Sequence, residues 1–251
     1  MKIVVIGGTG LIGSKVVQAL SSRGHDAVAA APSTGVNTIT GEGLADVMAG
    51  AAVVVDVSNS PALDDSAIEF FRTATTNLLA AEKNAGVGHH VALSVVGTTE
   101  LARQSGYFQA KLLQETLISN GPIPYSIVHA TQFFEFVDTL ADAATAGDTV
   151  IYPPAYFQPM AAADVGEGVA LVAMNEPVNG VTEIGGPEAV LLPDLIRTAL
   201  TARGDSRTVV ADPSAQYWGI DIDERTLVPG PGATLFDTRF EDWLLEAAAK
   251  S

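Results

Sequence analysis

The sequence contains no cysteine among its 251 residues. Disulfide bonds, thiolate catalysis and cysteine-based metal sites are therefore excluded. The four histidines, at positions 25, 89, 90 and 129, lack the spacing of zinc ligands. We therefore expect no metal site.

Basic residues are also scarce, with 13 Lys and Arg against 29 Asp and Glu, so the formal net charge is −16. A surface of this sign repels DNA and anionic membranes, and we expect neither as a partner. The acidity itself identifies no ligand. We expect a small-molecule substrate, and we leave open whether the chain forms a homo-oligomer.

Long apolar runs are missing as well. No run approaches the roughly 20 residues that a membrane-spanning helix needs. The N-terminal run MKIVVIGG is too short for a secretion signal and is followed by no small-residue cleavage site. Hydrophobic residues nevertheless make up 47% of the chain, which indicates a folded core. We expect a cytoplasmic protein.

Short apolar runs alternate with helical patterns through the first half of the chain. We expect strands at 2–6, 27–31, 36–40, 53–57, 90–96 and 125–129, and helices at 11–22, 44–49, 66–84 and 107–119. Alternating strands and helices imply right-handed crossovers, and the fully apolar strands favour burial on both faces. The pattern predicts an α/β fold with a Rossmann-type, doubly wound parallel sheet.

A glycine-rich loop follows the first expected strand, with the pattern Gly7-x-x-Gly10-x-x-Gly13. Gly7 allows a tight turn, Gly10 lets the backbone approach a pyrophosphate, and Gly13 lets the next helix pack closely on the strand. The helix N-terminus adds free N–H groups and a positive dipole end. The loop predicts a bound nicotinamide dinucleotide. The expected contacts are Gly7, Thr9, Gly10, Leu11, Ile12 and Gly13.

The end of the second strand bears on the choice between NAD and NADP. NAD-binding chains usually carry an acid there for the ribose 2′-hydroxyl. This chain has Ala29 to Thr34 at that place, with neither an acid nor an arginine. Ser33 and Thr34 offer hydroxyl groups to either cofactor. The missing acid favours NADP slightly.

Tyr107 and Lys111 are four residues apart on an expected helix, so they share one face. A nearby ammonium lowers the pKa of a tyrosine, and Tyr107 could then give a proton to a carbonyl oxygen. Lys111 could also bind the nicotinamide ribose. Ser94 ends the preceding strand and could hold the same carbonyl oxygen. We predict Ser94, Tyr107 and Lys111 as catalytic residues.

The second half of the chain is less regular, with expected helices at 162–174 and 193–202 and a strand at 181–184. We assign residues 1–130 to the dinucleotide-binding core. Residues 131–251 form a small C-terminal substrate-side cap, interleaved with the last strands in one compact unit. Its aromatic residues favour a flat, apolar substrate, with Gln132, Phe133 and Tyr156 as expected contacts.

At this point the chain resembles the short-chain dehydrogenase/reductase superfamily, and more narrowly its atypical, NmrA-like NAD(P)H-binding members. The resemblance rests on MKIVVIGGTGLIG, LSVVG, GYFQAKLLQE, YSIVHATQFFEF, MAAADVGEGVALV and EIGGPE. It implies a Rossmann domain with NAD(P)H and a carbonyl, quinone or sugar-nucleotide substrate. Ser94, Tyr107 and Lys111 match the superfamily's catalytic triad, and Glu42 and Ser58 match positions near its cofactor.

One position departs from the resemblance, because His129 stands where relatives often have arginine. We expect a buried histidine with a hydrogen-bond partner there.

The first hypothesis is therefore an NAD(P)H-dependent oxidoreductase that transfers hydride to a carbonyl or quinone. A reduced polycyclic substrate could react further with oxygen and give hydroxylation. The alternative is a non-catalytic NAD(P)-sensing regulator, which the Ser, Tyr and Lys set argues against. A nucleotide-sugar epimerase ranks last, because the second half has few basic residues for a diphosphate.

Overall fold

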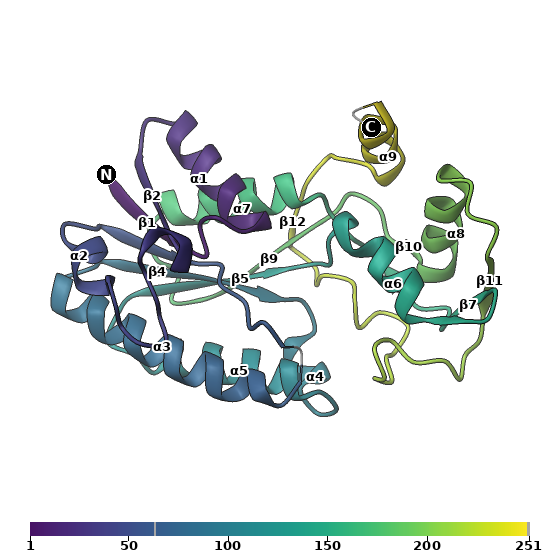
Figure 1. Ribbon diagram of the computed structural model, residues 1–251, viewed down its shortest axis with the longest axis horizontal. Coiled ribbons are helices and arrows are strands. Elements are labelled where there is room, and N and C mark those ends of the chain that lie inside the picture. Colours follow the sequence, from purple (N-terminus) through teal and green to yellow (C-terminus); the bar gives the residue numbers. More distant parts are fainter. Residues whose placement is uncertain (63, 250–251) are drawn as a thin grey trace. The chain divides into compact units, whose positions relative to one another are not determined.

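The computed structural model describes residues 1–62 and 64–249 of the chain (Figure 1). They form two compact units, which are described separately below. The first unit contains Met1–His129 and Val165–Thr182, and the second contains Ala130–Asp164 and Glu183–Ser251. Residues 250–251, at the end of the predicted cap, lie outside the described residues. The assignment of 131–251 to the substrate side stays a prediction.

A seven-stranded sheet has the order β12-β9-β5-β4-β3-β1-β2. Its strands are β1 (Lys2–Ile6), β2 (Asp26–Ala30), β3 (Val53–Asp56), β4 (His89–Val95), β5 (Tyr125–Ala130), β9 (Gly180–Gly185) and β12 (Thr234–Leu235). The pairs β1–β2, β1–β3, β3–β4 and β9–β12 are parallel. The predicted doubly wound α/β fold is confirmed.

Helices cover both faces of this sheet in the first unit. They are α1 (Leu11–Ser22), α2 (Leu44–Met48), α3 (Ser66–Ala85), α4 (Thr98–Leu101), α5 (Gly106–Ser119) and α7 (Ala162–Met174). In Figure 1, α1 and α7 lie on one face, and α3 and α5 lie on the other. Coverage on both sides explains why every residue of β3 is buried.

The strand predicted at 36–40 is wrong. Residues 38–40 form a turn instead, after the short 3₁₀ helix η1 (Pro32–Thr34). The Asn37 side chain accepts hydrogen bonds from the N–H groups of Ile39 and Thr40. Gly35 and Gly41 on either side have φ values of 82° and 79°. A side chain that bonds its own backbone and two left-handed glycines favour a turn over an extended strand.

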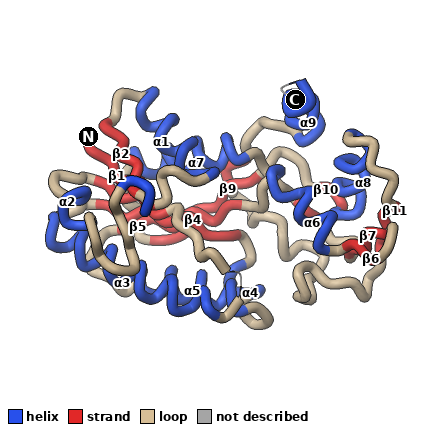
Figure 2. Tube along the Cα trace, viewed as in Figure 1, coloured by secondary structure: helices blue, strands red, loops and turns tan. Residues whose placement is uncertain are grey.

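The second unit is built from shorter elements. Its helical segments are η2 (Phe134–Phe136), α6 (Val137–Ala143), α8 (Leu192–Ala202) and α9 (Phe240–Ala249), and its further strands are β6 (Thr145–Ala146), β7 (Thr149–Tyr152), β8 (Tyr156–Phe157), β10 (Val190–Leu191) and β11 (Thr208–Ala211). Loop and turn dominate the stretch between β11 and β12 (Figure 2). Phe134 packs against Phe240 and Trp243 in the core of this unit.

Among the described residues, no helix combines the length and the hydropathy that crossing a bilayer requires.

Candidate active site

The glycine loop connects the end of β1 to the start of α1. Gly7 has a φ of +77°, which favours glycine, and the N–H of Gly10 donates to the carbonyl oxygen of Gly7 at 2.9 Å. A Cβ atom at Gly13 would collide with the same carbonyl oxygen. The first and third glycines of the pattern are therefore required for the turn and for the close approach of α1 to the loop.

Gly10 has a different role, because a Cβ atom there would meet only the oxygen of Gly7, at 3.3 Å. Gly10 is the N-cap of α1, and no side chain caps this helix end. The next residue, Leu11, is 43% exposed. An uncovered helix N-terminus with free N–H groups suits a phosphate, so the loop fits the pyrophosphate of a dinucleotide.

Several predicted cofactor residues gather around this loop. The hydroxyl groups of Thr9 and Ser33 lie 3.5 Å apart. A Cβ atom at Gly7 would lie 3.0 Å from the nitrogen of Ser58, so the chain after β3 passes directly over the loop. Ser58 itself donates its hydroxyl to Asp56 at 2.6 Å.

Two other predicted cofactor residues make different contacts. The hydroxyl of Thr34 accepts from the N–H of Ala31 at 2.9 Å and lies within hydrogen-bond distance of two carbonyl oxygens, so it holds the turn after β2. Glu42 is exposed before α2, and its backbone bonds to Thr40 and Asn37 within the turn before that helix.

Helix α5 positions Tyr107 at its first turn. Ser105 caps the helix by accepting a hydrogen bond from the N–H of Phe108. A Cβ atom at Gly106 would collide with Asp65, so glycine allows this helix start to approach the start of α3. The Tyr107 hydroxyl donates to Asn59 at 3.0 Å. Because Asn59 follows Ser58, a short stretch of chain links Tyr107 to the glycine loop.

The predicted effect of Lys111 on Tyr107 is wrong for the described conformation. Burial raises the pKa of Tyr107 to about 12, although the hydrogen bond to Asn59 partly opposes this. The Lys111 ammonium instead turns inward, where it donates to the carbonyl of Leu93 at 2.9 Å and to Gln114 at 2.5 Å. Tyr107 therefore keeps its proton at neutral pH, but in this conformation it is a weaker acid than an ordinary tyrosine.

Lys111 is buried and lies 4.6 Å from the centre of the Phe71 ring. Burial lowers its pKa to about 8, although the charges of Asp56 and Glu115 oppose that shift. Gln114 connects this lysine to Asp56, to which its amide donates at 2.9 Å. The resulting polar network lies at the carboxyl ends of β3 and β4, where folds of this type bind ligands.

Ser94 belongs to a neighbouring cluster that the sequence analysis missed in part. Its hydroxyl donates to Glu115, which also contacts Nε2 of His129 at 3.0 Å. The expected buried, hydrogen-bonded His129 is confirmed. The Lys111-x-x-x-Glu115 spacing, which places both side chains on one helix face, could have indicated the role of Glu115.

The predicted substrate residues belong to the second unit. The backbone carbonyl of Gln132 accepts from the N–H of Met160, and the ring of Phe133 lies 5.8 Å from that of Phe136, centre to centre, in a tilted arrangement. The buried side-chain oxygens of Thr131 and Gln132 have no hydrogen-bond partner among the described residues, which suits groups that bind a ligand. Tyr156 lies apart from them in sequence and carries Arg225 over its ring at 5.8 Å.

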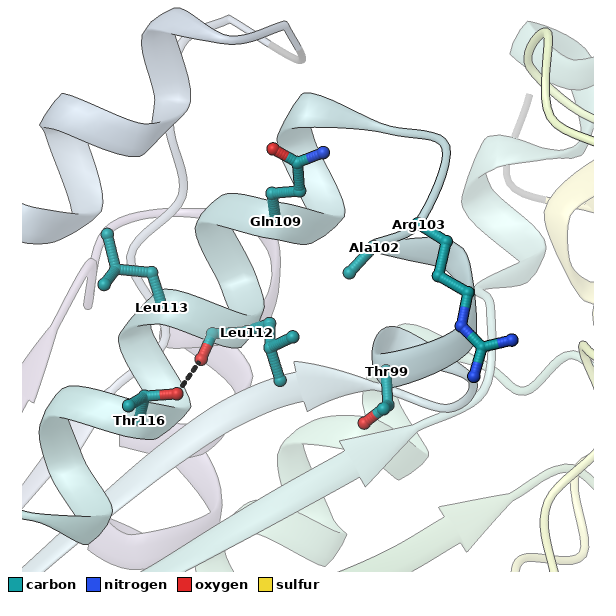
Figure 3. A pocket seen from close by; sticks show the side chains of 7 residues that line it. All are labelled: Thr99, Ala102, Arg103, Gln109, Leu112, Leu113 and Thr116. Carbon is teal, nitrogen blue, oxygen red and sulfur yellow. Dashed lines mark hydrogen bonds between the residues drawn. The ribbon is translucent and has the colours of Figure 1, made fainter.

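A shallow hollow of about 360 Å³ lies between α4 and α5 (Figure 3). It is lined by Thr99, Ala102, Arg103, Gln109, Leu112, Leu113 and Thr116. None of these is a predicted site residue, and Gln109, Leu112 and Thr116 project from α5 on a different side from Lys111 and Glu115. The hollow is therefore separate from the candidate site.

Comparisons with known proteins agree with this architecture. Residues 3–120 match the model of the NAD dependent epimerase/dehydratase family. A divinyl chlorophyllide a 8-vinyl-reductase from the chloroplast of Cucumis sativus is 29% identical over 227 residues, which are 76% of this chain and 54% of that protein. The chain thus spans about half the length of this curated relative.

Two solved structures share the fold. A short-chain dehydrogenase/reductase superfamily protein from Agrobacterium tumefaciens, with bound NAD, has a TM-score of 0.77 at 19% identity, over 99% of this chain and 96% of that one. An NADPH-dependent quinone oxidoreductase from Escherichia coli, with NADPH, has a TM-score of 0.74 at 16% identity, over 98% of this chain and 99% of that one. These matches confirm the predicted resemblance to the short-chain dehydrogenase/reductase superfamily.

Proposed function

We propose that this chain, which has the fold of the short-chain dehydrogenase/reductase superfamily, is an NAD(P)-dependent oxidoreductase that interconverts a carbonyl or quinone with its reduced form. The observation that carries the proposal is the linkage within the first unit. Ser58 lies against Gly7, and the adjacent Asn59 accepts the hydrogen bond of Tyr107. A proton donor and a phosphate-binding loop are thereby joined at one edge of the sheet.

The chain's own residues would share the work as follows. Gly10 and the N-terminus of α1 would hold the pyrophosphate, and Thr9 and Ser33 lie beside them. A bound NAD(P)H would supply hydride to the substrate carbon. Tyr107, released from Asn59, would give its proton to the substrate oxygen, and Ser94 would contact that oxygen once it is a hydroxyl group. Lys111 would keep a positive charge beside the site below about pH 8.

The choice of cofactor follows from the end of β2. That stretch carries no acid to repel a 2′-phosphate, which favours NADP slightly. A flat, apolar substrate suits the aromatic second unit, where Gln132, Phe133 and Tyr156 are the proposed contacts. The Escherichia coli protein of similar fold is a quinone oxidoreductase, which supports this substrate class.

Cofactor titrations test the first step. NADPH and NADH are titrated against the protein and against Gly10→Ala, with Gly88→Ala as the control because its Cβ would also meet only a distant backbone oxygen, at 3.7 Å. We expect Gly10→Ala to weaken NADPH binding by about tenfold, or roughly 1.4 kcal/mol. Equal binding by all three proteins would contradict the assigned loop.

A panel of ketones and quinones tests the reaction. The loss of nicotinamide absorbance is followed together with oxygen uptake, which separates simple reduction from oxygen-dependent hydroxylation. Tight cofactor binding without turnover of any compound would instead support the NAD(P)-sensing regulator.

A nucleotide-sugar epimerase or dehydratase is the second candidate, because the family model that matches residues 3–120 bears that description. Conversion of a UDP-sugar without net consumption of NAD(P) would support it.

A further inference from the structure

Three elements of the first unit bring Ser94, Glu115 and His129 together. Ser94 comes from β4, Glu115 from α5 and His129 from β5, and all three are buried. We call them the Ser-Glu-His cluster. One carboxylate oxygen, Oε1 of Glu115, contacts both the Ser94 hydroxyl and Nε2 of His129. Glu115 is thus the centre of the cluster, and Ser94, near the carboxyl end of β4, lies at one end of it.

The hydroxyl proton of Ser94 is already used within this cluster. A serine hydroxyl has one proton, and here it is donated to Glu115. The neighbouring Thr98 hydroxyl, 3.4 Å from that of Ser94, donates its own proton to the carbonyl of Val95 at 2.6 Å. Towards a further ligand, Ser94 can therefore only accept a hydrogen bond, through an oxygen lone pair.

The charges around Glu115 keep it ionised. Burial alone raises the pKa of Glu115, but the hydrogen bond and charge of His129, the Ser94 hydroxyl and the Lys111 charge together hold it below its usual value. Asp56 from β3 faces the same lysine. An ionised carboxylate accepts hydrogen bonds and donates none, so the direction of the Ser94 bond follows from the charge.

We propose that Glu115, held by His129, is a positioning residue that turns the Ser94 proton away from the substrate, so that Ser94 binds the alcohol form of the substrate and not its carbonyl form. A hydroxyl substrate can donate to the free lone pair of Ser94, whereas a carbonyl oxygen cannot. The inference rests on the proposed oxidoreductase function and gives Ser94 a specific part in it.

The binding test uses α-tetralone and α-tetralol, a flat ketone and its alcohol. The ketone is titrated into the protein with NADP⁺ and the alcohol into the protein with NADPH, so that neither complex turns over. We expect Ser94→Ala to weaken α-tetralol about tenfold, the effect of one hydrogen bond, and to change α-tetralone by less than about twofold. A larger loss for the ketone would overturn the proposal.

Variants of Glu115 test the positioning role. In Glu115→Leu the Ser94 proton becomes free, so α-tetralone should bind about tenfold more tightly, and adding Ser94→Ala should abolish that gain. A merely structural role for Glu115 would weaken both ligands alike. Ser126→Ala is the matched control, because Ser126 is also buried and contacts a histidine, His89, at 2.8 Å. It should leave both affinities unchanged.

A titration of the protein alone separates this inference from the proposed function. In carbon NMR of labelled glutamate carboxyl groups, Ser94→Ala should raise the titration midpoint of Glu115 by about one pH unit, since the carboxylate loses a donor. An unchanged midpoint would overturn the inference even if both probes bind. Absence of probe binding with a shifted midpoint would contradict the proposed function for flat ketones and leave the cluster supported.

Discussion

Within the described part of the first unit, two buried histidine–glutamate pairs make the same contact in different surroundings. His90 Nδ1 lies 2.8 Å from Glu82, and His129 Nε2 lies 3.0 Å from Glu115. His90 is the second residue of β4, at the amino end of the sheet, whereas His129 is the last but one residue of β5, at the carboxyl end.

The first pair is closed, in that it is completely enclosed in the core, whereas the glutamate of the second pair also binds a serine. The side chains of Glu82 and His90 are completely buried, and each leaves one polar atom without a partner among the described residues. Glu115 instead shares its oxygen with Ser94 at the edge where the glycine loop and Tyr107 lie. The difference agrees with the proposal that the pair at the amino end of the sheet serves the fold and the pair at the carboxyl end belongs to the candidate site.

The largest effect is expected on turnover, from a substitution at the carboxyl edge of the sheet. Tyr107→Phe removes the proposed proton donor, so turnover of an active ketone or quinone should fall by about 10²- to 10⁴-fold. The free energy of unfolding should change by only about 1 kcal/mol, since one hydrogen bond to Asn59 is lost. Steady-state kinetics and urea unfolding measure the two effects. Tyr125→Phe, at the amino end of β5, is the control, and equal losses in both variants would contradict the assignment.

The closed pair should show its effect in stability. Glu82→Leu leaves the buried His90 without its partner, so the free energy of unfolding should fall by about 3–5 kcal/mol. Adding His90→Leu should recover much of that loss, because an apolar pair leaves no polar atom unsatisfied. Urea unfolding of the single and double variants measures this coupling. A double variant no more stable than Glu82→Leu would show that the pair is not the cause.

The same pair should make stability depend on pH. Burial alone lowers the pKa of His90, but the charge and hydrogen bond of Glu82, together with the charge of Asp56, raise it above 6.5. The contribution of His90 to stability is therefore complete below pH 6.5 and is lost as the pH rises through the raised pKa. The slope should reach at most about 1.4 kcal/mol per pH unit. Unfolding titrations of the double leucine variant should lack this slope, and its persistence there would assign it to another group.

The smallest effect is expected for an exposed ion pair. Arg23, the C-cap residue of α1, pairs with Glu167 of α7, and about a third of each side chain is exposed. Glu167→Gln should therefore lower the free energy of unfolding by less than about 1 kcal/mol. Thermal unfolding at low and high salt checks this. A loss of unfolding free energy as large as that of Glu82→Leu would contradict the expected difference between buried and exposed ion pairs.

Much of the fold was predictable, because its signals are local. The apolar run of β1, the glycine pattern and the helical period of α1 lie within 22 consecutive residues. The turn at 38–40 was not predictable in the same way. Its apolar residues suggested a strand, and the side chain of Asn37 decided otherwise by binding the backbone.

The candidate site likewise combines local features, which the sequence indicates, with contacts between distant elements, which it does not. The Tyr107–Lys111 spacing is local, and it indicated a shared helix face. The inward turn of Lys111 depends on Leu93 and on the Asp56 network, which come from other elements. Helical periodicity does not indicate contacts with other elements. The shift in the pKa of Tyr107 was therefore predicted in the wrong direction.

By itself, the amino-acid sequence determined the doubly wound sheet and the glycine loop, because hydrophobic periods and glycine positions act over a few neighbouring residues. Only the tertiary structure decided that Ser94 donates to Glu115, 21 residues away, and that His129 contacts the same oxygen. The direction of a hydrogen bond depends on which charges surround it, and here those charges come from three separate elements that meet only in the folded chain.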